Sequence, residues 1–262
     1  MHAARLPALG RTAAQPADDT ELAGSRRAHG RAAREGRRSI VTAQSINLAG
    51  QTLDLLPQRA VFWRQTGALL LADLHLGKAA TFRRAGLAIP EGDNQSTLQR
   101  VDALISAWQP QSLILLGDIM HTSLATDPAL HRQLLDWRAS HPDLAITAII
   151  GNHDRDIRRL EPVIDCQVEG LERAGLTLRH HPPETPTEAP WIAGHWHPVV
   201  RLAAGGDSLR LPAFIHEPDG GLVLPAFGGL TGGALVERRP GRRRYVTSEA
   251  AVFGIDTRET AD

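Results

Sequence analysis

Five short segments of the chain place metal-binding residue types at the ends of apolar runs. The first is Asp73-Leu-His75, which directly follows Leu69-Leu-Leu-Ala. On an extended backbone residues i and i+2 point to the same side, so these two side chains can converge on one metal ion. The same pattern, an apolar run that ends in carboxylate, amide or imidazole, recurs at 112–118, 145–154, 176–181 and 191–197. Donors from five strand ends predict a hydrolase with two metal ions.

The elements that must position these residues alternate in the first half of the chain. Strands are expected at 60–64 and 68–72, joined by a turn, and again at 112–117 and 144–150. Apolar residues at helical spacing predict helices between them, one of which begins near Asn94 or Ser96. After residue 175 only turns separate the strands, which indicates a largely antiparallel second sheet. The predicted architecture is an α/β fold, a four-layer αββα sandwich of two mixed sheets flanked by helices.

Composition sets outer limits on the class of protein. The 262 residues suit one domain, and the formal net charge of zero does not by itself indicate a nucleic-acid or membrane partner. A single cysteine, Cys166, fits a reducing compartment, and no apolar stretch is long enough for a membrane span or a signal peptide. We therefore expect a cytoplasmic protein without a membrane partner.

The predicted domain limits follow the change in composition along the chain. Residues 1–43 are rich in alanine and arginine without apolar periodicity, so we expect a disordered extension. The extension is either a tail without function or a basic arm that binds nucleic acid. The catalytic domain is expected at 44–256, with a short tail at 257–262.

Together, the five segments resemble the calcineurin-like metallophosphoesterase superfamily. Its pattern is D-x-H, G-D-x-x-[D/N/H], G-N-H-[D/E], a lone H and G-H-x-H. The chain reads Asp73-Leu-His75, Gly117-Asp118-Ile-Met-His121, Gly151-Asn-His-Asp154, His180 and Gly194-His-Trp-His197. The resemblance implies the metallophosphoesterase fold and one metal held by Asp73, His75 and His197. A second metal would be held by Asn152, His180 and His195, with Asp118 bridging the two.

The resemblance also implies two divalent metal ions as the cofactor. Oxygen and nitrogen donors without a thiolate suit Mn²⁺, Fe or Zn²⁺, and the family favours Mn²⁺. Two such cations lower the pKa of a bound water and neutralise the phosphate oxygens during attack at phosphorus.

Other residues in or next to the motifs are predicted to act on the leaving group, to support the ligands or to contact the substrate. By resemblance, His153 faces the leaving-group oxygen and acts as a proton donor. Asp154 would then hold the His153 imidazole in one tautomer. His121 fits the last position of its motif, where it either supports the ligands from behind or binds metal directly. His180 and His181 compete for one ligand position, and the alternation of the strand favours His180, which leaves His181 near the substrate.

A narrower resemblance covers residues 45–250. The runs Ala72–Arg83, Leu211-Pro-Ala-Phe214 and Leu224–Gly233 are similar to the ligase-associated DNA-damage-response phosphoesterases, also called PdeM. This bacterial family implies a metal-dependent phosphodiesterase or endonuclease that acts on DNA. It also implies a repair ligase and a helicase as possible partners.

Two basic residues and one glycine-rich segment are candidates for substrate binding. Lys78 is the only lysine in a chain that otherwise uses arginine, and it lies three residues after a predicted ligand. A phosphate contact or chance retention would each account for it. Arg83 is either a bidentate phosphate clamp or a solvated surface residue. The glycines of 224–233 permit close backbone approach to the site, or form a structural turn.

Three functions are consistent with these residues. The first is a dinuclear phosphodiesterase, an endonuclease of a ligase-associated DNA repair system. The second is a nucleotide pyrophosphatase or phosphomonoesterase on small molecules. The third is a scaffold without catalysis, which a full set of ligands disfavours.

Overall fold

The computed structural model of the protein describes residues 42–256 except 155, 162, 168 and 169. The predicted extension 1–43, apart from its last two residues, and the predicted tail 257–262 lie outside the described residues. Thr42 pairs with Ala251 across an isolated bridge, so backbone pairing is already present two residues before the predicted boundary. Within the described ranges, each helix is too short or too polar to cross a membrane.

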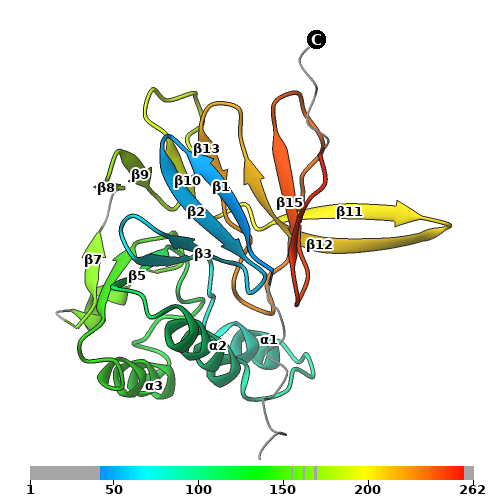
Figure 1. Ribbon diagram of the computed structural model, residues 1–262. Helices are drawn as coiled ribbons and strands as arrows, with labels where there is room; N and C mark the ends of the chain where they lie inside the picture. Colours follow the sequence, from blue (N-terminus) through cyan, green and yellow to red (C-terminus); the bar gives the residue numbers. More distant parts are fainter. Residues whose placement is uncertain (1–41, 155, 162, 168–169, 257–262) are drawn as a thin grey trace, which may run out of the picture. The chain divides into compact units, whose positions relative to one another are not determined.

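The first sheet contains seven strands in the order of the sequence (Figure 1). They are β1 (Gln44–Leu48), β2 (Gln51–Leu56), β3 (Ala60–Trp63), β4 (Ala68–Leu71), β5 (Ser112–Leu116), β6 (Ala145–Ile149) and β7 (Asp165–Gln167). β1 to β4 are antiparallel hairpins, whereas β4 to β7 are parallel. Every residue of β4 and β5 is buried, because both faces of these central strands are covered. The sheet is therefore mixed, as predicted.

Three helices connect the parallel strands and pack on one face of this sheet. They are α1 (Lys78–Arg84), α2 (Asp93–Trp108) and α3 (Pro128–Ala139). α2 buries Leu98, Val101 and Leu104 against residues of β4 and β5 that alternate along the strands. The predicted cap at Asn94 or Ser96 is wrong, because the helix begins at Asp93 after Gly92, which has a φ of 94°. The Asn94 side chain instead accepts a hydrogen bond from the amide of Gly77.

The second sheet is built by the later part of the chain. Its strands are β8 (Leu171–Arg173), β9 (Leu176–Leu178), β10 (Trp191–Ala193), β11 (Pro198–Ala204), β12 (Asp207–His216), β13 (Gly221–Val223), β14 (Ala234–Leu235), β15 (Arg243–Thr247) and β16 (Val252–Gly254). Their order is β14-β11-β12-β13-β10-β9-β8, with β15 beside β12 and β16 beside β15. β10 runs parallel to both β9 and β13, and β11 runs parallel to β14. The sheet is more mixed than the predicted antiparallel arrangement.

The two sheets share an apolar core. Leu70, Ile114 and Leu116 of the first sheet pack in one cluster with Ile192 and Phe214 of the second. This arrangement confirms the α/β class and the pair of mixed sheets.

The outer face of the second sheet differs from the predicted fourth layer. It has a cluster of its own, which includes Trp191, Val200 and Val246. Among the described residues, α1, α2 and α3 are the only α-helices, and all three precede this sheet in the chain. A second helical layer is therefore not found within 42–256 as described.

Burial of Phe214 between the sheets leads to a stability prediction. Phe214 is fully buried, whereas Phe253 on β16 is 54% exposed. Phe214→Ala should lower the free energy of unfolding by about 3–5 kcal/mol, because it leaves a cavity between the sheets. Phe253→Ala is the matched control and should stay within about 0.5 kcal/mol of the parent. Urea unfolding followed by circular dichroism measures both, and equal losses would contradict the described core.

Candidate metal centre

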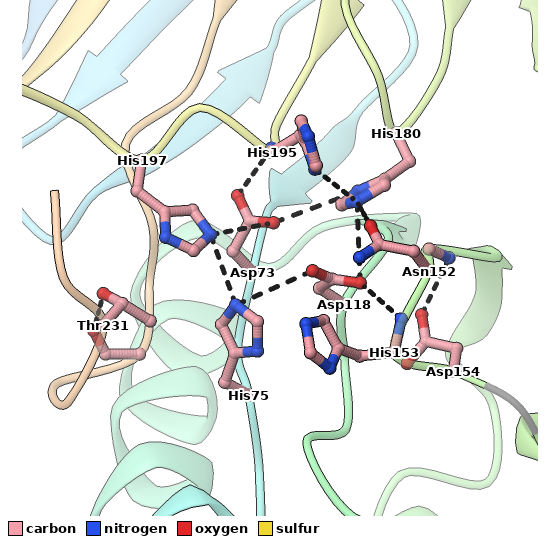
Figure 2. Close-up of polar contacts among 12 residues, drawn as sticks. Asp73, His75, Asp118, Asn152, His153, Asp154, His180, His195, His197 and Thr231 are labelled. Atoms are coloured by element: carbon pink, nitrogen blue, oxygen red, sulfur yellow. Dashed lines mark hydrogen bonds and ion pairs between the residues drawn. The ribbon is translucent and has the colours of Figure 1, made fainter. Parts of the chain in front are cut away.

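Four predicted ligands from three separate parts of the chain converge at the ends of the strands. One donor atom from each of Asp73, His75, Asp118 and His197 lies within 4.8 Å of the others. The Nε2 atoms of His75 and His197 are 3.2 Å apart, and His197 Nε2 is 3.4 Å from Asp73 Oδ1 (Figure 2). Both carboxylates and His75 are buried. The structure thus brings together the predicted ligands of the first metal with the predicted bridge.

A second group of donors lies beside the first. His180, His181 and His195 offer ring nitrogens within 4.8 Å of one another. His180 Nε2 is 3.1 Å from Asn152 Oδ1 and 3.2 Å from His195 Nδ1. His180 Nδ1 donates to the carbonyl oxygen of Leu116, which in the neutral ring leaves a lone pair on Nε2. Because His180 is buried and tied down in this way whereas His181 is exposed, the geometry favours His180 as the ligand.

Asp118 lies between the two groups. Its Oδ2 is 3.8 Å from His75 Nε2, and its Oδ1 is 3.5 Å from His180 Nε2. Each oxygen of one carboxylate therefore faces a different group of imidazoles, as Figure 2 shows. Oδ1 also accepts a hydrogen bond of 3.0 Å from the amide of His153, which fixes the carboxylate in this orientation.

The backbone at the ligands is left-handed rather than extended. Five predicted ligands have a positive φ: Asp73 (55°), His75 (50°), Asp118 (47°), His195 (69°) and His197 (47°). β4 ends at Leu71, so Asp73 and His75 lie beyond the strand. The prediction that they converge is correct, but the reason given for it, alternation along a strand, is wrong. Non-glycine residues in this region cost about 1–2 kcal/mol each, and they concentrate at functional sites.

Glycines in the motifs make room for the ligands. A Cβ on Gly117, whose φ is 79°, would collide with the imidazole of His180. A Cβ on Gly151 would collide with the backbone and carboxylate of Asp118. The G-D and G-N-H spacings are therefore packing requirements of the centre as well as sources of its ligands.

The chemistry of these donors fits two divalent cations. Asp73 Oδ1 is buried without a hydrogen-bond partner, and so is His75 Nδ1. Burial lowers the pKa of His75 to about 2, so its ring is neutral at physiological pH. Burial also lowers the pKa of His195. Neutral imidazoles and buried carboxylates that face one another need a positive charge between them, which two metal ions would provide.

His153 lies next to the ligands without joining either group. Its ring centroid is 5.4 Å from that of His75, and it stacks on His121 at 5.0 Å with an angle of 26° between the planes. His121 in turn meets His75 edge to face at 5.6 Å. Burial lowers the pKa of His121. This pairing of His121 with His153 was not predicted, and the place of His121 at the last position of its motif was its only sequence signal.

Asp154 has a different partner from the predicted one. Its Oδ1 accepts from the amide of Met120 and its Oδ2 from the amide of Gly151, each at 2.9 Å, in place of the predicted contact with the ring of His153. Burial raises the pKa of Asp154 to about 6. The carboxylate therefore links the loop after β5 to the loop after β6, and it positions Asp118 and Asn152 through the backbone.

The predicted substrate residues are placed at unequal distances from the centre. Lys78 is the first residue of α1; burial lowers its pKa, while the nearby carboxylates of Asp118 and Asp73 oppose that shift. His181 lies against His195, with ring centroids 4.1 Å apart. Arg83 donates to the carbonyl of Pro90, and no recorded contact between described residues joins it to the ligands. The amide of Lys78 donates to the carbonyl of His75, so Lys78 and His181 both adjoin predicted ligands, whereas Arg83 binds the loop between α1 and α2.

The glycine-rich segment 224–233 approaches the ligand loops closely. The amide of Gly228 donates to the carbonyl of Asp73, and a Cβ at Gly228 would collide with the carbonyl of Leu74. Arg100 holds the segment from the other side through the carbonyl and the ring of Phe227. Of the two readings of this segment, the structure supports close approach of the backbone to the site.

Replacing Asp118 should have opposite effects on stability with and without metal. In EDTA, Asp118→Asn removes one of two neighbouring buried carboxylates, so its melting temperature should equal or exceed that of the parent. In Mn²⁺ at 100 times the dissociation constant, the parent should gain about 2.7 kcal/mol, and the variant much less. Thermal melts by circular dichroism measure both effects, with Asp136→Asn on the exposed face of α3 as the control. Equal stabilisation of parent and Asp118→Asn by Mn²⁺ would contradict the assignment.

Comparison with known proteins agrees with this geometry. Neither a protein-family model nor a curated protein sequence matches the chain. Among solved structures, the chain is similar to the nuclease MPE of Pseudomonas putida, with a TM-score of 0.70 and 34% sequence identity. The match covers 82% of this chain and 100% of that one. The chain therefore belongs to the calcineurin-like metallophosphoesterases, and within them to the ligase-associated family that includes nuclease MPE.

Proposed function

We propose that the protein is a manganese-dependent phosphodiesterase that cleaves DNA. The observation that carries the proposal is the position of Asp118, whose two oxygens face two separate groups of metal-binding side chains. Two-metal sites of this kind suit the in-line displacement at a phosphodiester. DNA as the substrate is supported by the family resemblance and by the nuclease activity named for the similar P. putida protein.

The proposed roles of the ligands follow their grouping. Asp73, His75 and His197 would hold one metal, Asn152, His180 and His195 would hold the other, and Asp118 would be shared between them. When bound, the two ions supply Lewis acidity toward the phosphate and toward the attacking water. The protein's own contribution is to fix these seven donors on a strained, glycine-supported backbone, so that little reorganisation is needed during reaction.

The residues around the ligands act on the substrate itself. The Lys78 ammonium, set beside the carboxylates of the centre, neutralises charge on the phosphate. His153 donates a proton to the leaving oxygen, and His121, stacked on it, keeps its ring in place. His181 lies at the exposed side of the second group, where the substrate enters.

We further propose a place for the enzyme in the cell. It works in the cytoplasm, as the single buried cysteine and the family both suggest. Its partners there are the ligase and the helicase of a DNA repair system, as the family resemblance implies.

Substrate comparison tests the proposed activity. With Mn²⁺, the protein should hydrolyse bis-p-nitrophenyl phosphate and a gapped DNA duplex, and it should turn over p-nitrophenyl phosphate far more slowly. Asn152→Ala should lose both diester activities, because it removes a ligand of the second metal. Asn47→Ala, at an exposed position near the end of β1, is the matched control and should retain them. Turnover of nucleotide pyrophosphates alone would favour the small-molecule hydrolase, and inert protein would favour the scaffold.

The leaving group separates the proposed acid role of His153 from a structural one. His153→Ala should keep its Mn²⁺ stoichiometry but lower kcat on DNA by about 10²–10⁴-fold, because the departing sugar oxygen needs a proton. The loss on bis-p-nitrophenyl phosphate should be much smaller, since nitrophenolate leaves without one. Steady-state kinetics on both substrates, with metal content determined by mass spectrometry, measure the difference. Equal losses on the two substrates would refute the acid role.

A further inference from the structure

The β11–β12 hairpin extends beyond its neighbouring strands. Figure 1 shows its far end apart from the other strands of the second sheet. All ten residues from 201 to 210 are exposed, although the hairpin remains in register across this whole length. A turn at Gly205 and Gly206, with φ of 60° and 93°, closes it. A two-stranded ribbon exposed on both faces gains little stability from its own packing. Stability does not explain its length, whereas a role as a binding surface would.

The two faces of this ribbon differ in chemistry. Arg201 lies directly opposite Arg210, and Leu202 lies directly opposite Leu209. Because side chains alternate along a strand, the arginines share a face with Phe214, which packs between the two sheets. The leucines continue the outer face of the second sheet. The arginine pair is therefore on the same side of the second sheet as the first sheet and its ligand loops.

The arginine pair has no acidic partner among the described residues. Like charges directly opposite each other destabilise an antiparallel pair, and neither arginine forms a recorded ion pair. Arg210 donates one hydrogen bond of 2.8 Å to the carbonyl of Gly233, and Arg201 makes none with described residues. Most guanidinium donors of the pair are thus free to bind an anion.

The pair is connected to the metal centre through short contacts. β11 begins at Pro198, directly after the ligand His197, and the amide of Ala234 donates to the carbonyl of His197. The adjoining segment holds Gly233, which Arg210 contacts and where a Cβ would lie 3.1 Å from the carbonyl oxygen of His197. The extended backbone of β11 from Pro198 to Arg201, three residue steps, spans about 10 Å. This corresponds to the axial rise of about three base pairs of B-form DNA.

We propose that Arg201 and Arg210 bind phosphates of a nucleic-acid strand a few nucleotides away from the bond that is cleaved. The inference rests on the proposed function and makes its substrate class more specific: a polynucleotide rather than a small diester. A small diester has a single phosphate, which the metal centre occupies, so it offers the arginine pair no anion. Phosphate contacts of this type set the position of the strand and carry no sequence information.

Kinetics on a long and a short substrate test this inference. On a single-stranded oligonucleotide with Mn²⁺, the double variant Arg201→Ala/Arg210→Ala should raise KM about tenfold with little change in kcat. The slope of log(kcat/KM) against log[salt] should become shallower by about 1.4, the expected effect of two lost phosphate contacts on a single strand. Hydrolysis of bis-p-nitrophenyl phosphate should remain within about twofold of the parent, which also shows that the variant is folded.

Two single variants sharpen the result. Arg201→Ala alone should give about half of the change in salt slope, and because Arg201 has no recorded contact it should not disturb the ribbon. Arg201→Lys keeps the positive charge, so its KM and salt slope on the oligonucleotide should stay close to those of the parent. Arg173→Ala on β8, at the opposite end of the strand order, removes the same charge and should leave oligonucleotide kinetics unchanged.

The outcomes distinguish this inference from the proposed function. If the parent cleaves DNA and the double variant does so with unchanged KM and salt slope, the inference alone is overturned. If the parent hydrolyses small substrates but not DNA, the inference is overturned together with DNA as the substrate. If instead Leu202→Gln/Leu209→Gln changes the sedimentation coefficient while the arginine variants behave like the parent, the ribbon binds protein, and the inference fails.

Discussion

The structure depends on the cost of burying two carboxylates side by side. Asp73 is fully buried and Asp118 nearly so. Of the imidazoles around them, His180 donates its Nδ1–H to the carbonyl of Leu116, and burial keeps the ring of His75 neutral. Such an arrangement is unfavourable unless positive charge lies between the donors. Lys78, at the start of α1, is one compact charge beside two buried carboxylates and does not pair with either in a recorded salt bridge. Cations therefore stabilise the described conformation as well as the reaction, because the same donors serve both.

The backbone conformation at the predicted ligands is a second unfavourable contribution to the free energy of folding, and it too serves to bring the ligands together. Left-handed φ at Asp73, His75, Asp118, His195 and His197 lets adjacent loops run side by side past the strand ends. The amide of His75 reaches the carbonyl of Asp118, and the amide of Asp73 reaches that of Gly117. The surrounding core over-determines these conformations, since β4 and β5 are buried on both faces and cannot shift. A rigid double sheet is what allows strained loops to hold seven donors at fixed positions.

Much of this arrangement could be predicted from residue types. The exceptions arise where contacts between distant parts of the chain decide the local structure. Apolar runs that end in donors predicted the strands before the site and the meeting of their ligands, because the length and ends of an apolar run are local properties of the sequence. The left-handed turns at Asp73 and His75 could not be predicted, since tertiary contacts impose them against intrinsic preference. The partners of Asp154 are the backbone amides of Met120 and Gly151. Every residue type except proline has such an amide, so the pattern of side chains could not predict these contacts. Among the described residues, the α-helices all precede the second sheet, and only turns separate its later strands, as the sequence after residue 175 indicated.

The placement of positive charge accounts for how a chain of zero net charge can engage a polyanion. With 29 basic and 29 acidic residues, the whole molecule exerts little long-range attraction on DNA. Attraction must then come from particular sites, and these differ in kind. Lys78 is partly desolvated beside the ligands, where a single ammonium has a strong effect at short range. Arg201 and Arg210 are exposed, so each of their contacts is weak and salt-sensitive. Two aligned guanidinium groups gain by binding the same strand. Such a division makes cleavage depend on the centre and makes strand binding depend on the ribbon, so the two properties can vary independently.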